Sequence, residues 1–200
     1  MGQHIKHVCS HGYRMLKSLW KISKRLTDRN IRIQLVHSGI LSKVDYCNSL
    51  YTFLPKTQTK HLQKLINSSV RFIFHITGKD RMEHITPRLQ ELHFLPIEYR
   101  VKFKICLMVY KSLNNKSPIY IQELIKLREP NQNTFLRKDK DKLILAYTAP
   151  AKQDYKNRSF SYAAPQLWNT LPYNIRDSQS VSVFKTNLKT FYFSQWKDES

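Results

Sequence analysis

The clearest pattern of hydrophobic positions spans residues 97–113 and predicts a helix that is buried on most sides. This segment contains neither Gly nor Pro, and Pro96 stands before it, where a proline suits the first turn of a helix. Apolar residues occupy two sides of the helical projection, with Ile97, Val101, Ile105 and Met108 on one and Tyr99, Phe103, Cys106 and Tyr110 on the other. Because such a helix is normally contacted from several directions, we expect it to be central.

Helical periodicity also predicts two helices near the N-terminus. Residues 5–26 repeat apolar positions at spacings of three and four, at Ile5, Val8, Leu16, Leu19, Trp20 and Leu26. Gly12 should weaken the first turns of this helix. Thr27 and Asp28 form a typical cap for a second helix over residues 29–41. The inward residues of the second helix would be Ile31, Leu35 and Ile40.

A third amphipathic helix is expected to start at Thr57 or Thr59 and to end before Gly78. Its inward residues would be Leu62, Leu65, Ile66, Ser69, Val70 and Ile73. Shorter helices are expected after Thr86, after Ser117, within residues 158–172 and after Ser180. The predicted fold class is therefore mainly α, a helical bundle with an irregular loop and short C-terminal helices.

The pattern weakens over residues 129–158, where apolar content falls and Lys and Asp alternate. We interpret this segment as a loop or linker with at most one short strand. It would join a basic helical region, residues 1–128, to a C-terminal helical tail, residues 159–200.

Net charge is the feature of composition that is most informative about the binding partner. The 200 residues include 34 Lys or Arg and 14 Asp or Glu, a formal net charge of +20. Such a chain favours a polyanionic partner, nucleic acid first and an anionic membrane surface second. Membrane binding by residues 5–26 is the weaker alternative, because that helix contains Gly12 and has charge on several faces. No uncharged apolar run is long enough to cross a membrane, so we expect no membrane partner.

Two rows of cations are the candidate binding site. Lys60, Lys64 and Arg71 recur at i, i+4 and i+11 on one predicted helix, and Arg100, Lys104 and Lys111 repeat that spacing on the central helix. Each row falls within roughly 40° on a helical projection. We expect both rows to contact phosphates; the alternative is that they only keep the helices solvated.

Metal and cofactor sites are not expected. The cluster His4, His7, Cys9 and His11 has ligating side chains, but its spacing matches none of the usual zinc patterns. Three scattered cysteines do not form a disulfide framework and favour a reducing, intracellular setting. No glycine-rich phosphate loop is present.

Catalysis is not expected either. Asp45 has no neighbouring carboxylate and no His at a useful spacing, so we interpret it as a cap or turn residue. Cys47 could be a nucleophile, but we interpret it as a small buried thiol.

Three blocks of sequence, in order, resemble LINE-type non-LTR retrotransposon polyproteins of the Jockey-like branch. They read LSKVDYCNSLY, then HITPRLQELHFLPIEYRVKFKICLMVYKSL followed by SPIYI, then RSFSYAAPQLWNTLPYNIR followed by FKTNLKTFYF. The likeness covers residues 4–193 and corresponds to the segment C-terminal to the reverse-transcriptase palm. One departure is Phe94, where such elements usually have Trp.

The resemblance implies a thumb-like helical region and a C-terminal tail, which hold a template–primer duplex without acting on it. The palm and endonuclease of such polyproteins lie upstream, and no paired aspartates occur here. We therefore expect a non-enzymatic fragment that binds RNA or an RNA–DNA duplex without sequence specificity, with a palm domain possible in trans. The alternatives are a non-functional structural relic and one part of a mis-split reverse transcriptase.

Overall fold

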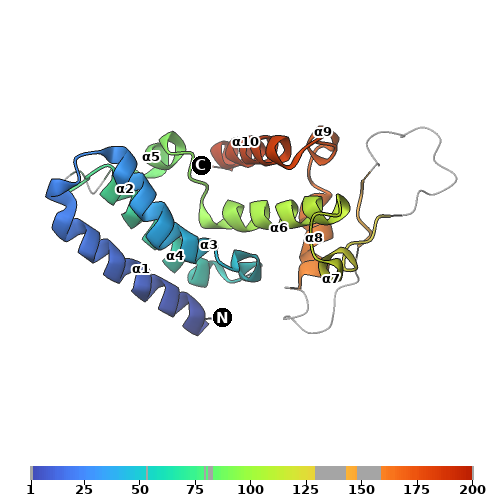
Figure 1. The fold of residues 1–200 in the computed structure, drawn as a ribbon, viewed down its shortest axis with the longest axis horizontal. Coiled ribbons are helices and arrows are strands. Elements are labelled where there is room, and N and C mark those ends of the chain that lie inside the picture. Colours follow the sequence, from blue (N-terminus) through green and yellow to red (C-terminus); the bar gives the residue numbers. More distant parts are fainter. Residues whose placement is uncertain are drawn as a thin grey trace. The chain divides into compact units, whose positions relative to one another are not determined.

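A computed structural model describes residues 2–52, 54–78, 80, 83–128, 143–147 and 159–199 of the chain. Within these ranges the protein is mainly α, as predicted, and its one β-bridge pairs Leu127 with Leu145 (Figure 1). The α-helices are α1 (Gly2–Ile22), α2 (Arg29–Val36), α3 (Ser42–Asp45), α4 (Lys56–Ile73), α5 (Thr86–Glu91), α6 (Ile97–Leu113), α7 (Ile119–Gln122), α8 (Phe160–Trp168), α9 (Tyr173–Arg176) and α10 (Val181–Glu199). Short 3-10 turns η1 (Ser23–Arg25) and η3 (Asn48–Tyr51) and a π-helical turn η2 (His37–Leu41) complete the described elements.

The chain divides into two compact units, Met1–Arg100 and Val101–Ser200. The division falls inside α6, whereas the sequence suggested a boundary after residue 128. It falls there because the start of α6 bonds to unit 1, where the Ile97 amide donates to Gln63 at 2.8 Å. Further along α6, Tyr110 belongs to unit 2 and stacks on Phe184 of α10. The predicted linker over residues 129–158 lies largely outside the described residues and stays a prediction.

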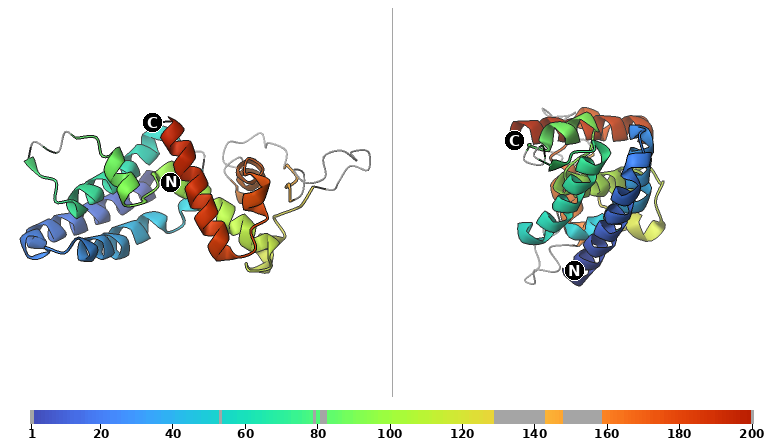
Figure 2. Two further views of the ribbon diagram at one scale, coloured as in Figure 1. Left: turned by 90° about the horizontal axis from the view of Figure 1, so that it is seen from above. Right: turned by 90° about the vertical axis from the view of Figure 1, so that its left-hand side faces the viewer.

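In unit 1, α1 and α4 lie side by side and run parallel (Figures 1 and 2). Gly12 of α1 lies opposite Leu65 of α4, and two turns later Trp20 lies opposite Phe72. A Cβ atom on Gly12 would lie only 2.5 Å from Leu65 Cδ2. The helix runs through Gly12 without a break, and the Leu65 side chain of α4 occupies the space beside Gly12 that a Cβ atom would fill.

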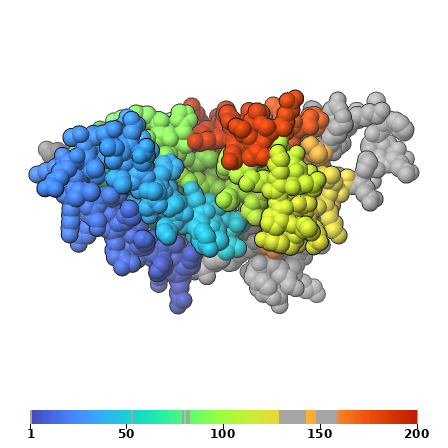
Figure 3. Space-filling model, in the orientation of Figure 1, coloured from blue at the N-terminus to red at the C-terminus, as the bar shows by residue number. Residues whose placement is uncertain are grey.

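The apolar face of α4 is the core of unit 1, as predicted. Its inward residues are all fully buried, namely Leu62, Leu65, Ile66, Ser69, Val70 and Ile73. From α1 the core receives Ile5, Val8, Leu16 and Leu19. The atoms of α1 and of α2 and α3 make up the near face of unit 1 in Figure 3.

The second predicted helix differs in detail. Asp28 caps it as expected, accepting a 2.7 Å hydrogen bond from the Asn30 amide, but α2 ends at Val36 and continues through the π-helical turn into α3. Ile40 is fully buried, whereas Ile31 is 45% exposed, so its inward assignment was wrong. The two residues are nine positions apart, which is half a turn on a helical projection, so one regular helix cannot bury both.

Unit 2 is organised around aromatic residues. The rings of Tyr110 on α6 and Phe184 on α10 stack with centroids 4.2 Å apart, and Trp168 of α8 lies 5.8 Å from Phe184. Trp168 is fully buried and donates its indole N–H to the Leu143 carbonyl at 2.7 Å. The helices expected within residues 158–172 and after Ser180 are present as α8 and α10, and these contacts pack their aromatic residues against α6.

Candidate nucleic-acid interface

The first cation row lies along α4, on the side away from its buried face. Lys60 and Lys64 are exposed, and Arg71 is half-buried two turns further along the same face. The separation follows from the helical period, since core positions such as Leu62 and Leu65 point the other way. The structure therefore places this row where a ligand can reach its two lysines.

Arg100, the first member of the second row, has a different environment. Its Nη1 donates to Asp45 Oδ2 at 2.5 Å, and its Nε donates to the Leu95 carbonyl at 3.1 Å. Its guanidinium also lies 5.9 Å from the Phe94 ring. With its side chain only 13% exposed, Arg100 connects the start of α6 to the last residue of α3 within unit 1.

Asp45 thus has a partner that the sequence did not reveal. The two residues are 55 positions apart, and no local spacing relates them. Asp45 also accepts a weak 3.4 Å hydrogen bond from Asn48, in keeping with its expected role in the turn.

The two predicted rows are divided between the two units. Lys104 is exposed and Lys111 is half-buried, and both belong to unit 2. Arg100 and the whole α4 row belong to unit 1. Within unit 1, the structure instead combines the end of the α4 row with residues of α1.

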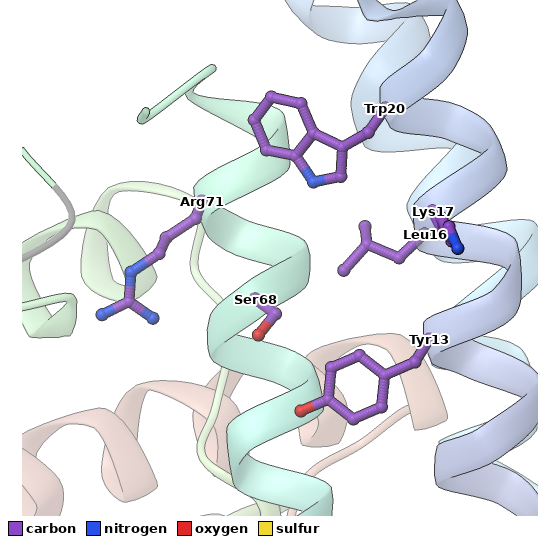
Figure 4. A pocket seen from close by; sticks show the side chains of 6 residues that line it. All are labelled: Tyr13, Leu16, Lys17, Trp20, Ser68 and Arg71. Atoms are coloured by element: carbon purple, nitrogen blue, oxygen red, sulfur yellow. The ribbon is translucent and has the colours of Figure 1, made fainter. Parts of the chain in front are cut away.

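That combination is a groove between α1 and α4, with a cavity volume of about 550 Å³ (Figure 4). Tyr13, Leu16, Lys17 and Trp20 line it from α1, and Ser68 and Arg71 line it from α4. Its size is within the range of about 300–1,000 Å³ that is usual for small-ligand sites. In Figure 4 the Tyr13, Leu16 and Trp20 side chains point from α1 toward α4.

Along α1 the groove begins at Tyr13, the residue after Gly12, and extends to Trp20. At Gly12, α1 has no side chain to place against α4, whereas at Trp20 an indole ring packs edge-on to Phe72, with centroids 5.3 Å apart. Trp20 also lies 5.5 Å from the His75 ring. Neighbouring rings on α4 and just after it therefore hold the indole in place at one end of the groove.

The two helices that form the groove carry basic side chains and no acidic ones. Neither α1 nor α4, both described in full, contains an Asp or a Glu. The exposed residues Lys6, Lys17 and Lys24 lie on one side of α1 and η1, the first two about three turns apart and the last two about two turns apart. On α4, the exposed Lys64 lies one turn before Ser68. Anions are therefore attracted to this surface with no carboxylate on either helix to compete.

Tyr13 and Lys17 were not recognised as site residues from the sequence. The signal was the spacing i, i+4 and i+7 of Tyr13, Lys17 and Trp20, which mixes aromatic and basic residues on one face. Trp20 was identified only as one of the apolar positions of this helix, and it is half-buried.

The buried cysteines do not supply nucleophiles. Burial raises the pKa of Cys106 to about 12, despite a 3.3 Å contact between its Sγ and the Tyr192 hydroxyl. Burial also raises the pKa of Cys9. Both thiols stay protonated at neutral pH, and a protonated thiol is a poor nucleophile and a poor metal ligand.

Two further observations concern metals and membranes. Among the residues that the structure describes, no group of three or more His, Cys, Asp or Glu side chains lies close enough to hold a metal ion. In the same part of the chain, none of the helices combines the length and the apolar composition of a membrane span.

No protein-family model, curated protein or solved structure matches this chain. The resemblance to LINE-type polyproteins therefore stays a prediction from the sequence blocks.

Proposed function

We propose that this chain is a palm-less segment of a LINE-type polymerase that holds nucleic acid without acting on it. The observation that supports the proposal best is the surface of unit 1, where α1 and α4 present cations and carry no acidic side chain. Contacts from Lys and Arg to phosphates supply affinity that does not depend on base sequence. The partner is RNA or an RNA–DNA duplex, and a polymerase palm supplied in trans would complete the enzyme.

Within this proposal the six predicted residues have unequal roles. Lys60 and Lys64 are the strongest phosphate ligands, because both are exposed on α4. Arg71 contributes from the groove, and Lys104 is an exposed candidate in unit 2. Arg100 acts mainly as a structural residue, because its guanidinium is held by Asp45 and the Leu95 carbonyl.

The test is a pair of double charge reversals. Lys60→Glu with Lys64→Glu should weaken binding to a short RNA–DNA duplex strongly. The slope of log affinity against log salt should become shallower by about two units, one for each phosphate that is no longer neutralised. The control, Lys116→Glu with Lys126→Glu, changes the net charge equally at exposed positions of unit 2.

The two variants separate a defined site from diffuse attraction. If both pairs bind the duplex with the same affinity and salt slope, the α4 row only keeps the helix solvated. The chain is then better described as a structural relic without its palm.

A further inference from the structure

The α1–α4 groove combines side chains that suit an unpaired nucleotide. Tyr13 is 41% exposed and offers a ring face, and Leu16 and Trp20 extend the apolar wall along the same helix. Lys17 is exposed one turn from both Tyr13 and Trp20, and Ser68 and Arg71 line the opposite wall, although the Arg71 guanidinium points away from α1 (Figure 4). Aromatic rings interleaved with cations are the usual means of binding single strands, because bases stack on the rings while phosphates contact the cations.

Charge decides between this ligand and others of similar size. A cationic ligand would meet Lys17 and Arg71 without a carboxylate on either helix. A purely apolar ligand would form no polar contact with Lys17 or the Ser68 hydroxyl. A nucleotide has a flat apolar face for Tyr13 and an anionic group for Lys17, so it uses both halves of the groove.

The state of the nucleic acid follows from the same geometry. In a duplex the base faces are covered by neighbouring base pairs, whereas an unpaired base can be splayed out and stacked on an aromatic side chain. Trp20 is already held by Phe72 and His75, so its ring needs little ordering when a ligand binds.

We propose that the α1–α4 groove binds an unpaired nucleotide of a single strand, with the base stacked on Tyr13 and the phosphate held by Lys17. This inference rests on the proposed nucleic-acid binding and adds a distinct site for single-stranded segments beside the α4 lysines.

The experiment compares two ligands of equal length, about ten nucleotides, which is in the range of single-strand site sizes. One is a single-stranded oligouridine and the other is an RNA–DNA duplex. Tyr13→Ala should weaken binding to the single strand by about 5- to 150-fold and change duplex binding much less. Tyr13→Phe keeps the ring and should retain single-strand affinity.

The matched control is Tyr46→Ala, which removes another exposed tyrosine of unit 1, 68% exposed and outside the groove. Trp20 supplies a second readout. The chain contains three tryptophans, and Trp168 and Trp196 are buried in unit 2. Fluorescence quenching by the single strand should therefore disappear in Trp20→Phe, a substitution that preserves an aromatic contact to Phe72.

Each outcome is informative about one of the two proposals. Equal single-strand affinity of Tyr13→Ala and Tyr46→Ala would overturn the groove site while leaving the α4 phosphate contacts in place. Binding of the duplex without binding of the single strand would do the same. If the unmodified chain binds neither ligand, nucleic-acid binding itself is wrong. Circular dichroism checks that each variant is folded.

Discussion

Arg100 and Asp45 form a 2.5 Å ion pair that links the first turn of α6 to the last residue of α3. The Arg100 side chain is 13% exposed and that of Asp45 is 37% exposed, so water screens the pair only partly. Arg100, which the sequence suggested as a phosphate ligand, is thus engaged in an ion pair within unit 1.

The pair predicts that Arg100 and Lys104 differ in their effect on stability. Arg100→Ala should lower the free energy of unfolding by about 1–3 kcal/mol, because Asp45 and the Leu95 carbonyl would both be without their charged donor. Lys104→Ala removes an equal charge from an exposed position of the same helix and should change stability little. Urea unfolding of both variants measures the difference, and equal midpoints would show that the ion pair contributes nothing.

Replacing Gly12 with Ala should lower the stability of unit 1, although Ala has a higher helix propensity than Gly. Ala in place of Gly favours a helix by about 1 kcal/mol, whereas a Cβ placed against buried Leu65 overpacks the contact at a cost of about 1–3 kcal/mol. We therefore expect Gly12→Ala to destabilise unit 1 by roughly 1 kcal/mol. Thermal unfolding should show a lower midpoint.

Two comparisons isolate the cause of this effect. Gly2→Ala, with no atom within 4 Å of the added Cβ, should not destabilise the chain. Gly12→Ala should cost less in a Leu65→Ala background, where the clash is gone. A stabilised Gly12→Ala variant would mean that Leu65 moves aside freely.

The cysteines should differ in reactivity. Cys47 is exposed, so its interpretation as a buried thiol was wrong, whereas Cys106 is fully buried and burial raises its pKa to about 12. At about pH 8, well below that pKa, Cys106 is protonated and inaccessible, so alkylation should label Cys47 first and Cys106 only after unfolding. Mass spectrometry of the peptides gives the order. Early labelling of Cys106 would show that α6 and α10 separate readily, because its Sγ contacts Tyr192 of α10.

The purified chain should neither extend a primer nor cleave nucleic acid when Mg²⁺ or Mn²⁺ is added. Two-metal catalysis needs carboxylates that hold two cations about 3.5–4 Å apart, and the sequence contains no adjacent aspartates. Asp45, which could have been suspected, is engaged by Arg100. Metal-dependent primer extension that disappears on mutation of a single Asp would contradict this prediction and identify a catalytic carboxylate.

The sequence predicted helices where one regular period describes the buried face. The bounds of α6 and the inward residues of α4 are as expected, because an uninterrupted apolar stripe determines both. Ile31 was misassigned because Ile31 and Ile40 were both taken as inward, although they lie nine positions apart and one regular helix buries only one of them. The π-helical turn that follows Val36 leaves no clear mark in the sequence.

Site residues were harder to predict, because they depend on neighbours that are distant along the chain. The Asp45–Arg100 pair spans 55 positions, and nothing near either residue indicates the other. Tyr13 is recognisable as a binding-site residue only from the groove that it lines together with Ser68 and Arg71 of another helix. The role of Gly12 likewise depends on its contact with Leu65, which belongs to another helix.

The absence of acidic residues from α1 and α4 has a consequence for folding. Two parallel helices whose ionised side chains are all cations repel each other, and their aligned dipoles add to that repulsion. Dissolved salt screens the repulsion over about 10 Å at 0.1 M, and a polyanion removes more of it by binding the folded form. The melting temperature of the chain should therefore rise with ionic strength, and at low salt a bound nucleic acid would act as the missing counter-ion of unit 1.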